Sequence, residues 1–358
     1  MTCVVNFSLA DQRKVDCATN PLQTTAGPPL DFAPLDGAGA LLYNVLTKLQ
    51  SAINALLSEG RIVKKKLLLI INPAAGRGAY KNSFAEAMHL LSRGGYVPTL
   101  AFTQGPGDAT RFAAEHAPDY DLVACIGGDG TLSEVLAGLM RVPAPPPVGY
   151  LPMGTANDVA TTLALPKNDA LGAARRILEG TPHPFDVGGF GENAYFAYIA
   201  AFGAFTEVSY ATPQEQKKAL GHLAYVLQGM QQLGKIEPIH TIVDYDGGHF
   251  EGDLIYGSMS NSTSVAGIVR LPETMVSLGD GVSELVLVRD PGSVAAFAEI
   301  VNSVLTERFD SDKLLILHTT RARFRFDKPV AWTRDGEAGG EYTDIELCNY
   351  PRPVQLIF

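Results

Sequence analysis

From Lys64 to residue 182, short apolar runs typical of buried strands alternate with segments whose apolar residues recur at helical spacing. The apolar runs predict strands at 67–72, 99–103, 121–126 and 148–151. The helical spacing predicts helices at 84–92, 109–115, 132–141, 156–163 and 170–179. This βαβαβαβα order implies a parallel sheet with helices on both faces.

The pattern changes past Phe185, where short β-like runs dominate and turn signals separate them. Strands are predicted at 194–201, 239–245, 254–260, 284–289, 314–320, 322–326 and 345–347, with helices at 214–233 and 293–306. With a boundary near 182–188, we predict an α/β domain over 61–184 and an antiparallel β-sandwich domain over 185–358. The last strand is a candidate to return to the first domain, and a small-molecule site is expected in the cleft between the two.

The first sixty residues carry a different pattern. Residues 1–35 hold four prolines and no periodicity, which predicts a poorly ordered extension, whereas 37–58 have apolar residues at helical spacing. We expect this helix to pack on the body of the protein or on a second subunit, as in a homodimer. An interfacial membrane helix is the alternative, although Lys48 is its sole charge.

Composition narrows the function classes. The chain has 358 residues, 46% of them hydrophobic and 18% charged, which is typical of a globular protein with room for two cores. Its formal net charge of −10 argues against a general nucleic-acid binder, because neutralising phosphates requires massed Lys and Arg. The same charge argues against attachment to anionic lipid by overall charge.

The cysteines and the first residues bear on the compartment. Cys3, Cys17, Cys125 and Cys348 are far apart, without zinc or disulfide spacing. No signal peptide is recognisable, and no uninterrupted apolar run is long enough to span a bilayer. The sequence therefore predicts a cytoplasmic protein.

Two glycine-containing segments follow predicted strands and precede helices. Residues 72–78, Asn-Pro-Ala-Ala-Gly-Arg-Gly, suit a loop whose backbone N–H groups approach phosphate oxygens, although a tight turn is the alternative. Residues 127–131, Gly-Gly-Asp-Gly-Thr, are the stronger signal, because a plain turn does not need three glycines after a parallel strand. Asp129 lies at the ligand edge of such a sheet, where it suits binding Mg²⁺ or orienting an attacking hydroxyl.

Two further motifs carry polar residues. In 152–158, Thr155 suits either capping the next helix or donating to a phosphate, and Asn157 with Asp158 suits anchoring the neighbouring glycine loop. Near the C-terminus, Asp335-Gly336-Glu337 places two carboxylates on one turn. They are either simply solvated or, in a cleft facing a nucleotide, a general base and a metal partner.

In this order, the four motifs resemble the diacylglycerol kinase catalytic-domain family, which includes sphingosine and ceramide kinases and is remotely similar to NAD kinases and phosphofructokinases. The resemblance runs from about Lys64 to Phe358. Residues 202–213 and 220–225 look most like the soluble bacterial branch, which phosphorylates diacylglycerol. One departure is Ala266-Gly267, where relatives more often carry Gly-Gly.

The resemblance implies roles for individual residues. Glu337 takes the place of the proton acceptor, with Asp129 and Asp335 as further catalytic candidates. A magnesium site is implied at Asp280 with the backbone carbonyls of Ser277 and Val282, against the alternative of a hairpin turn. The ATP-binding positions implied are Asn72, Pro73, Ala74, Ala75, Gly76, Thr103, Gly127, Gly128, Asp129, Gly130, Thr131, Leu132, Ser133, Gly154, Thr155, Asn157 and Asp158.

The activity implied is ATP- and Mg²⁺-dependent phosphorylation of a lipid hydroxyl, with diacylglycerol favoured. The alternative phosphate acceptors are a sphingoid base, another acylglycerol and NAD. A further alternative is a catalytically silent protein that binds a lipid or a nucleotide. A bilayer substrate implies reversible peripheral membrane contact, for which basic clusters are candidates. These clusters are Lys64-Lys65-Lys66, Lys217-Lys218, and Arg321, Arg323 and Arg325. The alternative interpretation is that they are solvated or form salt bridges with acidic residues.

Overall fold

The computed structural model describes residues 4–6, 64–76, 83–155, 157–204, 236–262, 264–265, 269–270, 276–306 and 308–358. Apart from Lys64, these residues belong to one compact unit. The predicted helices at 37–58 and 214–233, the Lys217-Lys218 pair and Ala266-Gly267 lie outside the described residues.

The predicted parallel sheet is confirmed. Its strands are hydrogen-bonded in the order β3-β2-β4-β5, which are Tyr96–Phe102, Lys65–Ile71, Leu122–Gly127 and Val148–Pro152. Consecutive residues of β2 point to opposite faces, so that Leu67 and Leu69 belong to one buried cluster and Leu68 and Ile70 to another. An uninterrupted apolar run therefore fits a strand that is covered on both faces.

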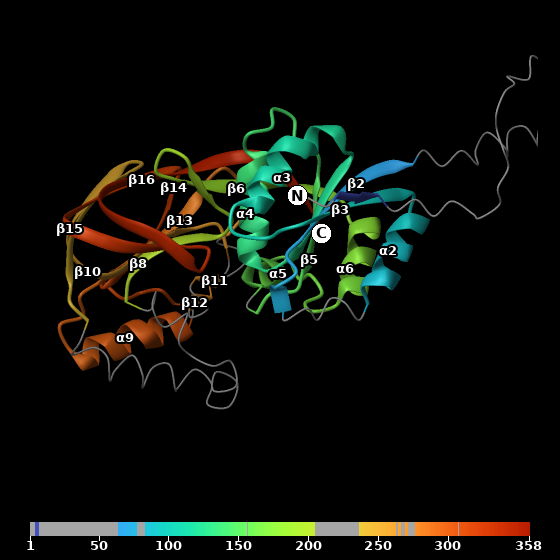
Figure 1. Ribbon diagram of the computed structural model, residues 1–358. Helices are drawn as coiled ribbons and strands as arrows, with labels where there is room; N and C mark the ends of the chain where they lie inside the picture. Colours follow the sequence, from blue (N-terminus) through green and yellow to red (C-terminus); the bar gives the residue numbers. More distant parts are fainter. Residues whose placement is uncertain are drawn as a thin grey trace, which may run out of the picture. The chain divides into compact units, whose positions relative to one another are not determined.

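Helices cover both faces of this sheet, as the sequence predicts (Figure 1). The first cluster includes residues of α2 (Phe84–Arg93) and α6 (Ala170–Glu179), which pack against each other. The second includes residues of α3 (Asp108–His116) and α4 (Asp129–Leu139). Helix α4 begins earlier than the predicted 132, directly after Gly128. Helix α5, Asp158–Thr162, is shorter than the predicted 156–163.

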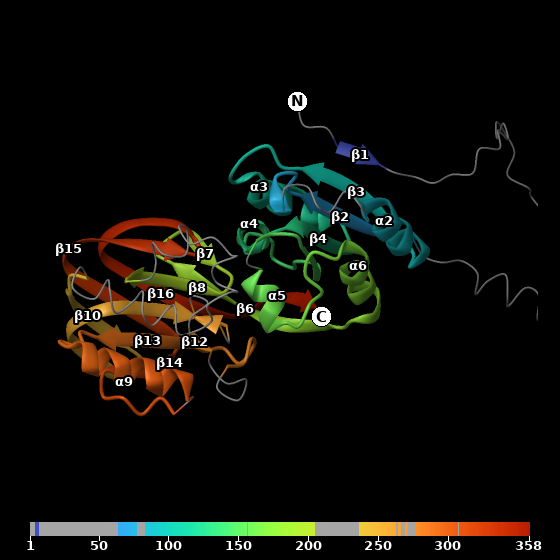
Figure 2. The ribbon, with the colours of Figure 1, turned by 90° about the horizontal axis from the view of Figure 1, so that it is seen from below.

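One further strand borders the parallel sheet. Residues Val4–Asn6 form β1, which pairs antiparallel with β3 (Figure 2). The expectation of a poorly ordered extension over 1–35 is therefore wrong for these three residues, because β3 offers an edge with unpaired backbone groups.

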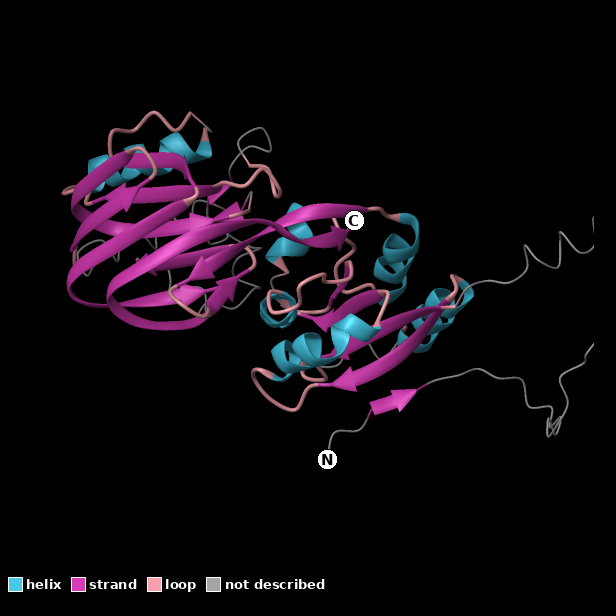
Figure 3. Ribbon diagram, turned by 90° about the horizontal axis from the view of Figure 1, so that it is seen from above, coloured by secondary structure: helices cyan, strands magenta, loops and turns pink. Residues whose placement is uncertain are grey.

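Past residue 182 the described chain is mainly antiparallel strand (Figure 3). Helix α9, Val294–Leu305, and the short pair β11–β12 accompany these strands. The strands are β6 Pro182–Phe190, β7 Ala194–Phe196, β8 Ile199–Gly203, β9 Ile239–Tyr245, β10 Gly248–Ser260, β11 Ser264–Val265, β12 Val269–Arg270, β13 Ser283–Arg289, β14 Leu314–Thr319, β15 Arg321–Arg334 and β16 Glu337–Ile357.

These strands do not divide into the separate sheets of the expected sandwich. Strand β10 pairs with β9 along its first half and with β8 along its second, and β15 pairs with the same two strands. Long strands that change neighbours along their length join these strands into one hydrogen-bonded network, which together with β1 to β5 comprises 14 of the described strands. The predicted run 194–201 is also interrupted between β7 and β8.

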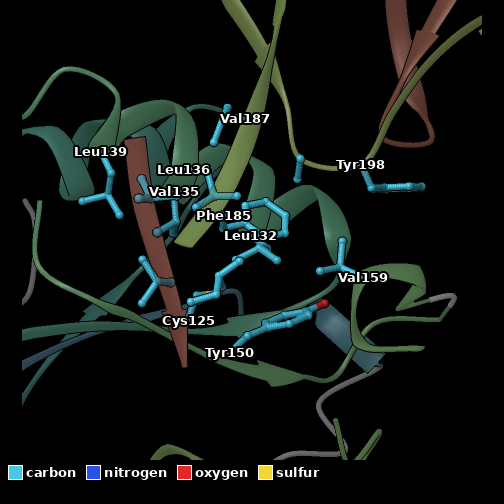
Figure 4. Close-up of a cluster of buried hydrophobic side chains, with 14 of the residues drawn as sticks. Cys125, Leu132, Val135, Leu136, Leu139, Tyr150, Val159, Phe185, Val187 and Tyr198 are labelled. Atoms are coloured by element: carbon cyan, nitrogen blue, oxygen red, sulfur yellow. The ribbon is translucent and has the colours of Figure 1, made fainter. Parts of the chain in front are cut away.

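Strand β16 connects the β-rich region with the parallel sheet. It pairs antiparallel with β15 and β6, and near its end Leu356 pairs in parallel with Val148 of β5. Strand β6 runs through 182–188 without a break. Accordingly, one buried cluster combines Leu132 of α4 and Tyr150 of β5 with Phe185 of β6 (Figure 4).

Candidate active site

The glycine loops that follow β4 and β5 lie against each other. A Cβ atom built on Gly128 would lie 3.2 Å from the Cα of Gly154, and one built on Gly154 would lie 2.7 Å from Oδ1 of Asn157 and still closer to Gly128. The N–H of Met153 donates to the carbonyl oxygen of Gly127 at 2.7 Å. Only residues without Cβ atoms allow this approach, which is a physical reason for glycine at both positions.

Asp129 links the same two loops through its carboxylate. Its Oδ2 accepts the N–H of Asp158 at 2.9 Å, and its Oδ1 accepts the N–H of Val159 at 3.2 Å. Asp129 thereby caps α5 from another element, while Thr155 lies exposed on the preceding loop. Burial raises the pKa of Asp129 to about 6, although the two N–H groups partly oppose this rise.

Asn157 fixes the shape of the loop ahead of α5. It is fully buried and has a φ of 53°, in the left-handed region. Its Oδ1 accepts the N–H of Gly154 and its Nδ2 donates to the carbonyl oxygen of Gly154, both at 2.9 Å. The Tyr150 hydroxyl lies 3.4 Å from Oδ1. Asn157 is therefore a structural anchor of this loop.

The first glycine-containing loop joins the same group at Asn72. Its Nδ2 donates to the Thr131 hydroxyl at 3.2 Å, and its Oδ1 accepts the N–H of Ala74 at 3.0 Å. Gly76 adopts a φ of 55°, and the loop from Arg77 onward lies outside the described residues. Thr103 is half-buried, and its N–H donates to the carbonyl oxygen of Ile71 at the neighbouring strand end.

Asp335 is buried in the turn between β15 and β16, with a φ of 48°. Its carboxylate accepts the N–H groups of Ala197, Tyr198 and Ile199 at 2.6 to 3.1 Å, as well as a hydrogen bond from the Ser133 side chain. Burial raises the pKa of Asp335, and these hydrogen bonds oppose the rise. The carboxylate thus ties the turn to α4 and to the segment between β7 and β8, which explains the break in the predicted strand.

Glu337 differs from Asp335 because its side chain is exposed. Its Oε1 faces Gly130 so closely that a Cβ atom on that glycine would lie 2.6 Å away. Both Glu337 and Gly130 line a cavity of about 280 Å³. The other residues around it are Pro106, Gly107, Thr110, Ser133, Glu134, Ala137, Arg141, Asn193, Ala194, Tyr195, Arg334 and Asp335.

Glu134 is a residue of this site that the sequence analysis missed. Its Oε1 accepts the N–H of Gly107 at 2.9 Å, and its Oε2 accepts the N–H of Ala109 at 3.1 Å. Glu134 therefore binds the start of α3 to α4 beside the cavity. A glutamate in the second turn of a helix usually lies on a solvated face, so its position alone gave no signal.

The residues of the predicted magnesium site lie in another cluster, around the buried Asp186. Oδ1 of Asp280 accepts the N–H of Val282 at 3.1 Å, which is a turn hydrogen bond, and Ser277 is exposed. The Asp186 carboxylate accepts the N–H of Gly281 at 2.7 Å. Within the described ranges no group of three or more His, Cys, Asp or Glu side chains is arranged to hold a metal ion.

The arginines of β15 are paired with aspartates. Arg323 forms two hydrogen bonds with Asp344, at 2.8 and 2.7 Å, and Arg325 contacts Asp244. Arg321 lies 3.5 Å from an oxygen of the Asp246 carboxylate. The arginines on this face of β15 are therefore in salt bridges rather than unpaired. Among the described helices, none is both long and apolar enough to cross a membrane.

The comparisons with known proteins agree with this arrangement. Residues 66–190 match the model of the diacylglycerol kinase catalytic domain. A diacylglycerol kinase of Bacillus subtilis (strain 168) is 33% identical over 296 residues, which cover 82% of this chain and 96% of that protein. This chain belongs to the diacylglycerol kinase family.

Further family members support the assignment. A diacylglycerol kinase of Staphylococcus aureus (strain Newman) is 36% identical over 229 residues, 63% of this chain and 71% of that protein. The crystal structure of a candidate diacylglycerol kinase from Bacillus anthracis strain Sterne superposes with a TM-score of 0.69 at 26% identity, covering 82% of this chain and 95% of that one. The resemblance stated from the motifs is confirmed, and the chain is a lipid kinase.

Proposed function

We propose that this lipid kinase transfers the γ-phosphate of ATP to the free hydroxyl of diacylglycerol, which yields phosphatidic acid. The observation that carries the proposal is that Oε1 of Glu337 lies close to Gly130. Gly130 is in the first turn of α4, the helix that follows the main glycine loop. A proton acceptor thus lies next to backbone suited to phosphate.

The glycine loops supply the phosphate-binding surface. Gly128 and Gly154 leave no Cβ atoms between the two loops, and α4 begins at Asp129 with the positive end of its dipole. Phosphoryl transfer depends on positioning and charge neutralisation, which this rigid backbone provides. Asn72 and Asn157 stabilise the loops through hydrogen bonds and take no part in the chemical step.

The carboxylates have distinct roles in this mechanism. Glu337 accepts the proton of the lipid hydroxyl as that oxygen attacks the γ-phosphorus and the bond to the β-phosphate oxygen breaks. Asp335 is a positioning residue, since its oxygens are already occupied by backbone N–H groups and Ser133. Asp129 holds the two loops together through the N–H groups of Asp158 and Val159.

Magnesium fits Asp129 as a ligand. The carboxylate offers about four acceptor positions, and the N–H groups of Asp158 and Val159 use two of them. When bound, Mg²⁺ would neutralise charge on the transferring phosphate. Asp280, with one oxygen in a turn hydrogen bond, retains a second oxygen for a separate ion, for which Ser277 and Val282 would supply carbonyl oxygens.

The decisive experiment is a radiolabelled ATP assay against diacylglycerol, a sphingoid base, ceramide and NAD. Phosphatidic acid is the expected product. Glu337→Gln should lower kcat by about 10²- to 10⁴-fold, the usual contribution of a general base. Glu341→Gln, an exposed glutamate on the same strand, is the matched control and should retain activity. Preferred phosphorylation of another acceptor, or full activity of Glu337→Gln, would refute the proposal.

Membrane contact is part of the same proposal, because the acceptor is a bilayer lipid. Lys64, Lys65 and Lys66 are exposed at the start of β2, whereas the arginines of β15 are occupied by aspartates. Co-sedimentation with vesicles should therefore increase with anionic lipid and decrease with salt. Changing all three lysines to Ser should weaken it, and binding that is unaffected by both salt and this change would contradict the assignment.

A further inference from the structure

Three polar side chains form a row on one face of β10. Tyr256, Ser258 and Ser260 alternate along the strand after a register shift between Leu254 and Tyr256, so their side chains point to the same side. The hydroxyl oxygens of all three are buried, and none has a hydrogen-bond partner of good geometry in the part of the chain that the structure describes. Burial raises the pKa of Tyr256, and the Ser258 hydroxyl, which approaches the phenol oxygen, offsets this only in part.

Apolar side chains border this row on both sides. On β8, Ile199 and Ala201 lie directly opposite Ser260 and Ser258. On β13, Val286 lies opposite Ser258 and is also buried. These apolar neighbours belong to one buried cluster that also contains Tyr256. The face is therefore a polar stripe within an apolar surface.

A stripe of buried polar groups without partners lowers the stability of the fold. A buried hydroxyl without a partner costs about 1–3 kcal/mol, and native proteins keep few of them. Glu284, opposite Ser260 on β13, adds a fourth unpaired atom, Oε2. Burial raises the pKa of Glu284 to about 8, so near neutral pH its carboxyl group is mostly protonated and, like the hydroxyls, a hydrogen-bond donor.

One end of the row lies next to the candidate active site. Ile199, the neighbour of Ser260, donates its N–H to Asp335 at 3.1 Å. Just past Ser260, the Ser262 hydroxyl lies 3.1 Å from that of Thr162 in α5, the helix that Asp129 caps. The row therefore runs from the carboxylates and glycine loops into the β-rich region.

We infer that Tyr256, Ser258 and Ser260 bind the ester carbonyl oxygens of the acceptor lipid. This inference rests on the proposed function and specifies how its substrate is recognised. Hydroxyl groups donate to ester carbonyls, which cannot donate in return, and the apolar neighbours suit the adjoining acyl chains. The Cα atoms of neighbouring residues in the row are about 6.8 Å apart, two residues of antiparallel strand. A diacylglycerol has two ester carbonyls, so the row offers enough donors for both.

The test combines single substitutions with a change of lipid. Ser258→Ala, Ser260→Ala and Tyr256→Phe each remove one unpaired oxygen, and each should raise the KM for diacylglycerol about tenfold, equivalent to 1.4 kcal/mol, with the KM for ATP unchanged. With a dialkylglycerol, which has ether oxygens and no carbonyls, wild type and variants should show the same KM. Thermal stability should be equal or higher in each variant, because an unsatisfied buried group is lost.

Ser283→Ala is the matched control. Its hydroxyl is also buried and unpaired, but Ser283 precedes Glu284 and therefore lies on the other face of β13. It should leave both lipid KM values unchanged. Unchanged diacylglycerol KM in all three β10 variants, or equal losses with ester and ether lipids, would overturn the inference and favour hydroxyls that hold only internal water. Absence of diacylglycerol phosphorylation by wild type would instead refute the proposed function.

Discussion

Replacing Asp335 by asparagine tests whether this carboxylate positions the catalytic turn or reacts itself. In the folded protein it accepts three backbone N–H groups and a hydrogen bond from Ser133. The asparagine side chain would offer one acceptor oxygen, and its NH₂ group would face donors that the second carboxylate oxygen now accepts.

The magnitude follows from counting these donors. The asparagine oxygen can keep the Tyr198 and Ile199 N–H groups, which share Oδ1, and the Ser133 hydroxyl can turn to accept from the new NH₂. The Ala197 N–H, which Oδ2 now accepts, loses its partner, at about 1–3 kcal/mol. Burial already raises the pKa of Asp335, so removing the charge recovers part of that cost, and we expect about 1–2 kcal/mol of lost stability. A typical domain is stabilised by about 5–15 kcal/mol, so a loss of this size is measurable.

Urea unfolding measures this loss directly, because Trp332 is the sole tryptophan, is buried, and lies three residues from the substitution. Asp344→Asn, an exposed site on β16, is the matched control and should shift the urea midpoint little. With Asp335→Asn, kcat should decrease because Glu337 is held less firmly, while the pH dependence of kcat keeps its shape. Unchanged unfolding together with a kcat reduced by more than about 10²-fold would refute the positioning role and favour direct participation.

Three further outcomes are expected. Gly154→Ala should weaken ATP binding in a nucleotide titration at least about tenfold, because the added methyl overlaps Gly128, whereas Gly105→Ala, with nothing within 4 Å, should not. Folding raises the pKa of Glu284 from 4.5 to about 8, so ionisation opposes folding increasingly as pH rises through that interval. Glu284→Gln should therefore stabilise the protein by on the order of 3 kcal/mol at pH 9 in urea unfolding and make no difference near pH 4; equal effects at both would contradict the assignment. With Asp129 at a pKa of about 6, kcat/KM should decrease below that pH as the ionised form is lost, and a profile flat down to pH 5 would exclude a requirement for this carboxylate.

The parallel sheet and its glycine loops were predictable because their signals are local. Each buried strand is an apolar run, and each loop follows its strand directly in the chain. The glycines at 128 and 154 are recognisable for the same reason, since close approach of backbone requires residues without Cβ, and Gly127 leaves room for the Thr131 side chain. The sequence alone does not show that two such loops touch each other.

The positioning role of Asp335 was not predictable, because its hydrogen-bond partners are remote in the chain. Asp335 and Ala197 are 138 residues apart, so no spacing rule connects them. The lengths of β15 and β16 were underestimated for a different reason. Many of their residues are exposed and charged, such as Arg323 and Glu346, and only short apolar segments between them resemble strands. Neighbouring strands, rather than residue preference, extend them.

The pairing of Leu356 with Val148 has a consequence for the order in which the protein forms during synthesis. The edge of β5 is completed by a strand that the ribosome delivers more than two hundred residues later. Until then the nascent chain presents an apolar strand edge, which invites pairing with other chains. Chaperone dependence and aggregation of this kinase should therefore be decided by release of residues near 356, and slow steps in translation ahead of β16 would prolong the exposed state.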